Sequence, residues 1–196
     1  MAKKRVAVLI SGRGSNMASL IAAAKAPDYP AAIALIISNR PAADGLTHAR
    51  REGIATEIVD HTAYGKDREA FERALQEVLD RQNIDIVCLA GFMRLFTPSF
   101  VQRWEGRMIN IHPALLPAFK GLNTHERALA EGAKTHGATV HFVSPEMDSG
   151  PIIAQAEVPV LANDTAASLA ARVLEVEHQI YPQALKAVAE GRARLG

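Results

Sequence analysis

Three polar side chains in the second half of the chain have the types that stabilise charge in a reaction: an amide, an imidazole and a carboxylate. Asn110 and His112 are two residues apart in an apolar run, and residues i and i+2 of a strand lie on the same face. Asp148 lies in a turn-rich segment that can fold back toward that face. A carboxylate beside an imidazole favours the imidazolium form, which is an acid near neutral pH. Each residue alone also has an ordinary explanation as a turn or strand-end residue, so their meaning depends on the fold.

A glycine-containing segment near the N-terminus, Gly12–Asn16 (GRGSN), has the composition of an anion-binding turn. It lies between the apolar run 6–10 and an amphipathic stretch, where an open parallel sheet binds ligands. Glycine lets the backbone approach a phosphate, and the N–H groups and dipole at the start of a helix favour one. Ser15 and Asn16 are able either to cap the helix or to donate to a ligand. The segment favours a phosphate monoester, with an ordinary strand-to-helix turn as the alternative.

A dinucleotide is the competing ligand for this turn. Its fingerprint needs a third glycine where Met17 stands, and an acidic residue after the second strand, where the sequence has 38–40 (SNR). Arg40 would suit the 2′-phosphate of NADP, so an NADP-dependent oxidoreductase is weakened but stays open. A P-loop is excluded because no Gly-Lys-Ser/Thr follows at the required spacing.

The histidines and the single cysteine do not favour a metal site or a nucleophilic hydrolase. Four of the seven histidines cluster in the second half, without a His-Glu-x-x-His or carboxylate-flanked pair: His112, His125, His136 and His141. Cys88 lies in the apolar run 86–90, which predicts a buried, unreactive thiol and no internal disulfide. No Gly-x-Ser-x-Gly elbow is present, which excludes a typical serine hydrolase. We therefore expect no metal and no covalent intermediate on cysteine or serine.

The elements that must position these side chains alternate between apolar runs and amphipathic stretches. The runs predict strands at 6–10, 33–37, 54–59, 84–89, 108–112, 139–143 and 152–160. The amphipathic stretches predict helices at 16–26, 43–51, 66–81, from 98 onward with Thr97 as cap, and at 165–190, the last bent or broken before Pro182. Uniformly apolar strands separated by helices indicate an α/β fold, a mostly parallel sheet covered on both faces. The last two strands are expected to form an antiparallel pair, and 1–196 to be a single domain.

Composition and charge limit the class of protein. The 196 residues are 48% hydrophobic and 22% charged with a formal net charge of +1, which is typical of a globular protein without a nucleic-acid-binding or lipid-binding surface. The N-terminal apolar run is too short for a signal peptide, and no stretch approaches the about 20 apolar residues of a membrane span. We expect a cytoplasmic protein that binds neither nucleic acid nor membrane.

Taken together, several segments strongly resemble the phosphoribosylglycinamide formyltransferase family, folate-dependent enzymes of purine biosynthesis. The similarity covers almost the whole chain. The segments are 8–16 (VLISGRGSN), 89–94 (LAGFMR), 110–117 (NIHPALLP), 121–125 (GLNTH), 136–143 (HGATVHFV), 148–153 (DSGPII) and 177–182 (EHQIYP).

The resemblance implies a Rossmann-like formyltransferase fold and a reaction without metal. The formyl group would pass from 10-formyltetrahydrofolate, as co-substrate, to the amine of 5-phosphoribosylglycinamide (glycinamide ribonucleotide). By resemblance, the catalytic trio is Asn110, His112 and Asp148. The nucleotide is held by Gly14, Ser15, Asn16 and Glu177, and the folate by Arg68, Met93, Arg94, Leu95, Phe96 and Asn110. The chain would act as a monomer or homodimer.

Other formyltransferases share the Asn-x-His and Leu-Leu-Pro features. Methionyl-tRNA formyltransferase needs a further C-terminal domain, and formyltetrahydrofolate hydrolase carries an N-terminal regulatory one, so the length favours the small nucleotide acceptor. A tRNA acceptor would also require a basic face. The alternatives from other classes are the NADP-dependent oxidoreductase and a non-catalytic nucleotide-binding module.

Overall fold

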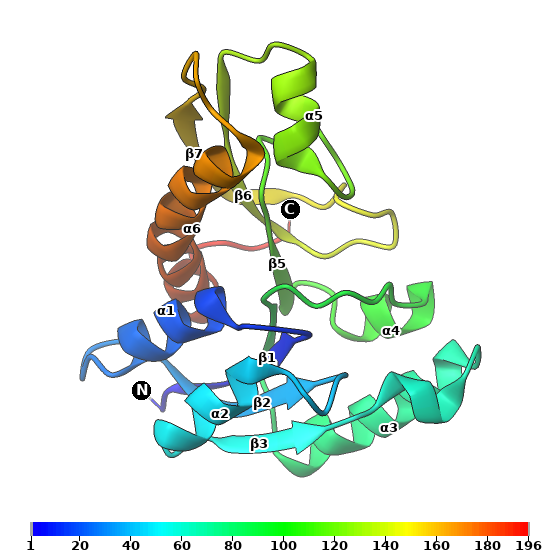
Figure 1. Ribbon diagram of the computed structural model, residues 1–196. Coiled ribbons are helices and arrows are strands. Elements are labelled where there is room, and N and C mark those ends of the chain that lie inside the picture. Colours follow the sequence, from blue (N-terminus) through cyan, green and yellow to red (C-terminus); the bar gives the residue numbers. More distant parts are fainter. Residues whose placement is uncertain (1, 196) are drawn as a thin grey trace.

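A seven-stranded sheet runs through the molecule in the order β3-β2-β1-β4-β5-β6-β7 (Figure 1). The structure is a computed structural model and describes residues 2–195. The strands are β1 (Lys4–Ile10), β2 (Ala31–Ser38), β3 (Ala55–Ile58), β4 (Ile86–Leu89), β5 (Met108–His112), β6 (Thr135–Phe142) and β7 (Ile152–Pro159). The first five pair in parallel, whereas β6 is antiparallel to β5 and β7 to β6. The predicted mostly parallel sheet and its antiparallel C-terminal pair are confirmed. The antiparallel β5–β6 pairing was not predicted.

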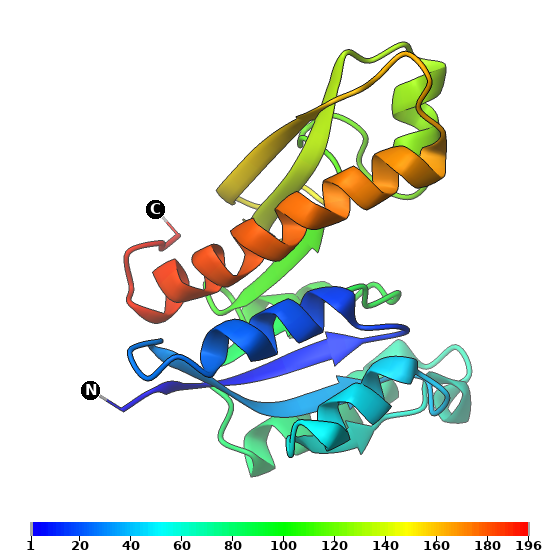
Figure 2. The ribbon, with the colours of Figure 1, turned by 60° about the vertical axis from the view of Figure 1, so that its left-hand side comes forward.

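Helices cover both faces of the sheet (Figure 2). They are α1 (Ser15–Ala24), α2 (Asp44–Arg51), α3 (Arg68–Arg81), α4 (Pro98–Arg103), α5 (Thr124–Ala130) and α6 (Ala166–Ala189), with a 3₁₀ turn η1 (His61–Tyr64). Alternate residues of β1 enter different cores because successive side chains of a strand point to opposite faces. Val6 and Val8 pack with residues of α1 and α6, while Ala7 and Leu9 pack with residues of α3 and α4. The expectation of a two-sided α/β sheet is therefore correct.

Helix α6 differs from the sequence prediction, because it continues through Pro182 without a break. Proline inside a helix removes one hydrogen bond and costs about 3 kcal/mol. The apolar residues on both sides of it, including Ile180 and Leu185, are buried in the core, and this packing holds the helix together. The Tyr29 hydroxyl also donates to the Pro182 carbonyl at 2.7 Å. Two short elements, α5 and η1, were not predicted, because neither is long enough to show a helical period.

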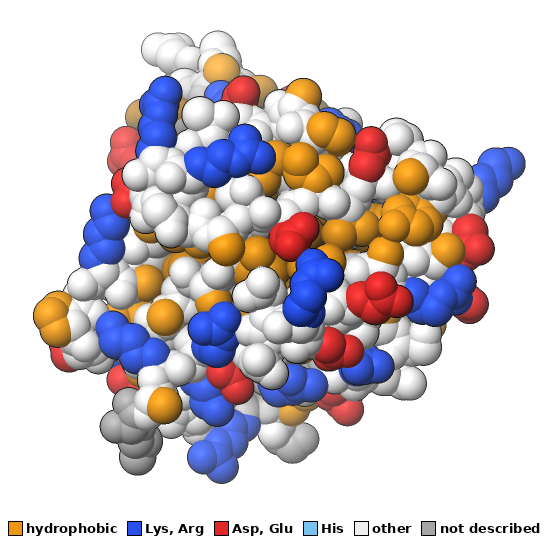
Figure 3. All heavy atoms as spheres, turned by 90° about the horizontal axis from the view of Figure 1, so that it is seen from below, with side chains coloured by type: hydrophobic (Ala, Val, Ile, Leu, Met, Phe, Trp, Pro, Cys, Tyr) orange, Lys and Arg blue, Asp and Glu red, His pale blue; other side chains and the backbone are white. Residues whose placement is uncertain are grey.

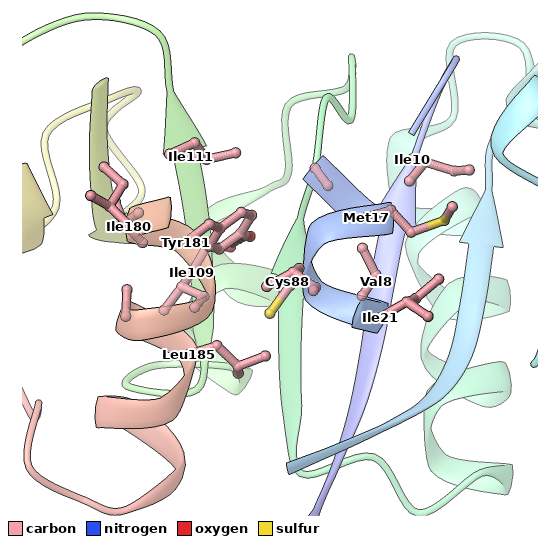
Figure 4. Packing of buried hydrophobic residues seen from close by; sticks show 14 of the residues in the cluster. Val8, Ile10, Met17, Ile21, Cys88, Ile109, Ile111, Ile180, Tyr181 and Leu185 are labelled. Atoms are coloured by element: carbon pink, nitrogen blue, oxygen red, sulfur yellow. Dashed lines mark hydrogen bonds between the residues drawn. The ribbon is translucent and has the colours of Figure 1, made fainter. Parts of the chain in front are cut away.

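Tyr181 on α6 joins this helix to the centre of the sheet (Figure 4). Its side chain is fully buried, and its hydroxyl donates to the Leu89 carbonyl at 2.8 Å, with the Ile109 carbonyl at 3.3 Å. These carbonyls belong to β4 and β5, just before the segments that carry the candidate site. Cys88 lies in the same cluster, and burial raises the pKa of its thiol to about 12. The predicted burial of this thiol is confirmed.

We expect Tyr181→Phe to lower the free energy of unfolding by about 1–3 kcal/mol, because the buried Leu89 carbonyl would lose its donor. Urea unfolding followed by circular dichroism measures this change. Tyr64→Phe is a suitable control because Tyr64 is only partly buried. Equal stability of Tyr181→Phe and the unmodified chain would contradict the structural role of the hydroxyl.

No helix within residues 2–195 is both long enough and apolar enough to cross a membrane. On the face shown in Figure 3, basic and acidic side chains are interspersed rather than gathered into one basic surface.

Candidate functional site

Asp148 lies between two imidazoles beside the end of β5. Its Oδ2 atom is 3.5 Å from Nδ1 of His112, and its Oδ1 atom is 3.8 Å from Nε2 of His141. The three side chains are at most 10% exposed. Asp148 adopts the left-handed conformation with φ of 52°, and Oδ2 accepts a hydrogen bond from the Gly121 backbone at 2.8 Å. The turn that carries Asp148 thus folds back onto the strand, as the sequence suggested.

Both ring nitrogens of His112 face hydrogen-bond acceptors. Nε2 lies 2.9 Å from the backbone carbonyl of Phe119, and Nδ1 faces the Asp148 carboxylate. A neutral imidazole has only one N–H, whereas the imidazolium has two. Both ring nitrogens of His112 therefore have an acceptor within reach of an N–H.

His141 is a site residue that the sequence analysis left without a role. Its Nδ1 atom lies 2.8 Å from the Phe142 carbonyl, which assigns the proton to Nδ1 and leaves Nε2 as an acceptor. Burial lowers the pKa of His141, while the Phe142 carbonyl and Asp148 oppose this, and the neutral form is favoured. Nε2 then accepts from Nδ2 of Asn110 at 3.3 Å, which turns the amide N–H₂ of Asn110 toward β6. One N–H of that amide is left for a ligand.

The proline-containing loop after β5 is held by β6. Thr139 accepts from the Leu116 backbone N–H at 3.1 Å and donates to the Ala114 carbonyl at 2.7 Å. Gln155 on β7 donates to the Leu116 carbonyl at 2.8 Å. These three hydrogen bonds hold the loop in place in addition to its prolines, Pro113 and Pro117.

The glycine-containing turn meets helix α6 from the far end of the chain. Gly14 is the N-cap of α1 in the left-handed conformation, with φ of 74° and no side-chain cap, so Ser15 and Asn16 do not cap the helix. Instead, Nδ2 of Asn16 donates to Oε2 of Glu177 at 3.2 Å. A hollow of about 180 Å³ adjoins this contact, lined by Gly12, Arg13, Gly14, Ser15, Asn16, Ala90 and Gly91. The backbone N–H groups at the start of α1 and the small residues around them suit a phosphate.

Glu177 is buried at 6% exposure, and this burial raises the pKa of its carboxyl to about 7, while Asn16 partly opposes the shift. The folded chain therefore binds the Glu177 proton more tightly than the unfolded chain. The contribution of Glu177 to stability is fully present below the unfolded pKa of 4.5 and is lost as the pH rises through about 7.

We expect Glu177→Gln to remove this decline, because glutamine does not ionise. Relative to the variant, the ligand-free unmodified chain should lose roughly 3 kcal/mol of unfolding free energy between pH 4.5 and about pH 8. Urea unfolding of both proteins across this range measures the difference. Parallel pH dependences of the two proteins would contradict the burial of an ionisable carboxyl here.

The residues expected at the folate lie at the carboxyl end of β4 and at the start of α3. Residues 93–96 form an irregular segment between β4 and α4, with Met93 and Leu95 more than half exposed. Arg68 is the first residue of α3, one turn before Phe71, whose ring stacks on Phe92 at 6.5 Å. The structure thus places Arg68 on the element that packs against the 93–96 segment.

No group of three or more histidine, cysteine, aspartate or glutamate residues within the described part of the chain, 2–195, is arranged to hold a metal ion. His125 and His136 instead pack edge to face, with ring centroids 5.2 Å apart.

Comparison with known proteins now adds to this geometry. Residues 4–185 match the sequence model of the protein family described as Formyl transferase. The phosphoribosylglycinamide formyltransferase of Escherichia coli is 45% identical over 190 residues, which cover 97% of this chain and 89% of that protein.

The chain belongs to the phosphoribosylglycinamide formyltransferase family.

Solved structures of the phosphoribosylglycinamide formyltransferase family agree with this assignment. The structure from Brucella melitensis is 51% identical in sequence to this chain and superposes with a TM-score of 0.91. The match covers 95% of this chain and 96% of the Brucella melitensis chain. The glycinamide ribonucleotide transformylase 1 of Symbiobacterium toebii is 45% identical with a TM-score of 0.95, covering 99% and 91%. The human trifunctional purine biosynthetic protein adenosine-3 is 52% identical over 99% of this chain, but the chain spans only 19% of its length. The resemblance and the formyltransferase fold predicted from the sequence are confirmed, and the NADP-dependent alternative is not supported.

Proposed function

We propose that the chain transfers the formyl group of 10-formyltetrahydrofolate to the amine of 5-phosphoribosylglycinamide. The products are formylglycinamide ribonucleotide and tetrahydrofolate, in de novo purine (IMP) biosynthesis. The observation that carries the proposal is the position of Asp148 between His112 and His141, with Asn110 bonded to the same His141. This arrangement presents an amide and an imidazolium to one reacting group.

In the proposed reaction the free amine attacks the formyl carbon, and the formyl oxygen becomes an oxyanion. Asn110 donates its remaining amide N–H to this oxygen, and imidazolium His112 donates the second hydrogen bond. The C–N bond to the acceptor forms and the bond to N10 of the folate breaks. A proton moves from the attacking amine to N10, with a bound water as carrier. Asp148 keeps His112 charged throughout.

The Phe119 carbonyl takes the Nε2 hydrogen bond of His112 in this structure. The proposed mechanism needs that N–H at the oxyanion, so Phe119 must give up this contact when the folate binds. Phe119 has φ of 55°, in the left-handed region that a bulky residue seldom adopts.

On the nucleotide side, Gly14, Ser15 and Asn16 hold the phosphate at the start of α1. Glu177 orients the glycinamide end. Oδ1 of Asn16 is buried and has no partner among residues 2–195. It supplies an acceptor beside the Glu177 carboxyl, as an amino or amide group of the nucleotide requires.

On the folate side, Arg68 and the segment formed by Met93, Arg94, Leu95 and Phe96 bind the co-substrate, together with Asn110. The chain is further proposed to be a single formyltransferase domain over 1–196. It acts in the cytoplasm as a monomer or homodimer, without a metal, nucleic acid or membrane partner.

A folate absorbance assay tests this function. The chain is mixed with 10-formyltetrahydrofolate, and deformylation is followed with and without 5-phosphoribosylglycinamide. We expect deformylation that depends on the nucleotide. Deformylation at the same rate without it, or none with it, would contradict the proposal.

A further inference from the structure

The 93–96 segment has no regular secondary structure, yet it joins two rigid elements, β4 and α4. The backbone N–H groups of Arg94 and Leu95 take part in no hydrogen bond among the described residues 2–195. Free backbone donors of this kind bind a ligand well only when the segment is held in place beforehand. The residues that hold it therefore matter as much as those that touch the ligand.

Ser11 holds the N-terminal end of the segment. This residue follows β1 and is 4% exposed. Its hydroxyl accepts from the Met93 backbone N–H at 2.8 Å and donates to Oδ1 of Asn39 at 2.6 Å. Asn39 is 1% exposed, so the bridge between the ends of β1, β2 and β4 is shielded from water.

Glu72 holds the C-terminal end. It lies on α3 and is 5% exposed. Its two carboxylate oxygens accept from Thr97, one from the backbone N–H at 2.6 Å and the other from the hydroxyl at 2.5 Å. Thr97 directly follows the segment and is the N-cap of α4. Hydrogen bonds that a buried carboxylate accepts from neutral donors are among the stronger ones in proteins.

Stacked aromatic rings support the segment between these two points. Phe92 and Phe96 stack with centroids 5.4 Å apart, between Phe71 of α3 at one end and Phe100 of α4 at the other. The stacked rings limit lateral movement of the segment, but they do not fix the direction of its backbone N–H groups. The hydrogen bonds to Ser11 and Glu72 do.

We propose that Ser11 and Glu72 are positioning residues that hold the 93–96 segment from its two ends and thereby set the affinity for the folate co-substrate. Neither side chain is assigned a contact with the folate. The proposal rests on the proposed function, because it takes folate as the ligand of this segment.

Glu72→Ala tests the C-terminal point, with Gln76→Ala as its matched control. Gln76 lies one turn further along the same helix, is also buried, and accepts from Nε1 of Trp104 at 2.8 Å, away from the segment. We expect Glu72→Ala to raise the Kd for tetrahydrofolate about tenfold or more, with the Kd for 5-phosphoribosylglycinamide unchanged. Gln76→Ala should lower stability but leave both Kd values unchanged. Glu72→Gln should restore tight folate binding, because glutamine can accept from the Thr97 N–H and donate to its hydroxyl.

Ser11→Ala tests the N-terminal point, with Ser38→Ala as its control. Ser38 is a fully buried serine at the end of the neighbouring strand β2, and among residues 2–195 its hydroxyl hydrogen bonds only with the backbone of Arg40 in its own turn. We expect Ser11→Ala to raise the Kd for tetrahydrofolate about tenfold, and Ser38→Ala to leave it unchanged. Hydrogen exchange at the Met93 and Thr97 amides should become faster in Ser11→Ala and Glu72→Ala respectively.

Two results would overturn the proposal: an unchanged tetrahydrofolate Kd in Ser11→Ala and Glu72→Ala, or equal rises in the variants and their controls. If Glu72→Ala does not fold, Thr97→Val takes its place as the test. This substitution removes the hydrogen bond from the Thr97 hydroxyl to Glu72 and keeps the one from the Thr97 backbone N–H. The unmodified chain separates this proposal from the proposed function. Absence of tetrahydrofolate binding by the unmodified chain contradicts both, whereas binding that the variants leave intact contradicts only the positioning role.

Discussion

His112→Ala is expected to lower kcat by about 10²–10³-fold, equivalent to about 2.7–4 kcal/mol of transition-state stabilisation, as for loss of an oxyanion-hole donor. In the proposed mechanism His112 is one of the two donors to the developing negative charge, and alanine offers none. The measurement is kcat for formyl transfer with both substrates saturating. Because His112 is buried and contacts Asp148, its loss also leaves the Asp148 side chain without this partner.

His48→Ala is the control for this variant, because His48 is a partly buried histidine on α2, among the last residues of that helix. It should leave kcat unchanged. Urea unfolding of both variants separates a loss of fold from a loss of chemistry. A folded His112→Ala chain that turns over at the unmodified rate would rule out the oxyanion role.

Asp148→Asn is expected to lower kcat by about 10²–10⁴-fold, the range over which a positioned acid or base contributes. Asparagine keeps the size of the side chain and tolerates the left-handed backbone at this position, where φ is 52°. It also keeps an oxygen for the Gly121 N–H, so the turn is retained. What it lacks is the negative charge that Asp148 places between the imidazoles of His112 and His141.

The pH dependence of kcat distinguishes this role from a structural one. In Asp148→Asn the charge beside His112 is removed, so the pH profile of the remaining activity should differ in shape from that of the unmodified chain. Asp164→Asn is the control, since Asp164 is a similarly buried carboxylate that pairs with Arg172 at 2.7 Å. It should reduce stability without changing kcat or its pH profile. An Asp148→Asn profile identical in shape to that of the unmodified chain would contradict the charge role.

Local sequence was sufficient for most of the elements, and the exceptions have physical causes. The strands of the first half are uniformly apolar because both faces of a parallel sheet are covered, and this signal does not depend on distant residues. Helix α6 was predicted to be bent or broken before Pro182, because proline removes a local hydrogen bond. It is not broken, because burial against α1 and the sheet holds it together. The antiparallel β5–β6 pairing depends on a return of the chain through α5, and no local pattern encodes it.

The candidate site likewise combines features that are visible in the sequence with features that only the fold reveals. The residue types of Asn110, His112 and Asp148 are visible in the sequence, and the motifs around them identified the family. His141 had a visible signal, a polar residue between Val140 and Phe142 on an apolar strand, but its function follows from the register that places it opposite Asn110. The contact between Asn16 and Glu177 joins residues 161 positions apart. The raised pKa of Glu177 comes from burial, which is a property of the folded chain.

The sequence by itself determined the chemical groups that the protein can use and the order in which its elements follow one another, because side-chain types and periodicity are local properties. Only the tertiary structure decided which groups meet. It placed Asp148 between two imidazoles and oriented the Asn110 amide by its hydrogen bond with His141. It also fixed the two ends of the 93–96 segment by hydrogen bonds to Ser11 and Glu72. Charge, proton position and preorganisation all depend on distances of a few ångströms between residues far apart in the chain, and packing alone sets those distances.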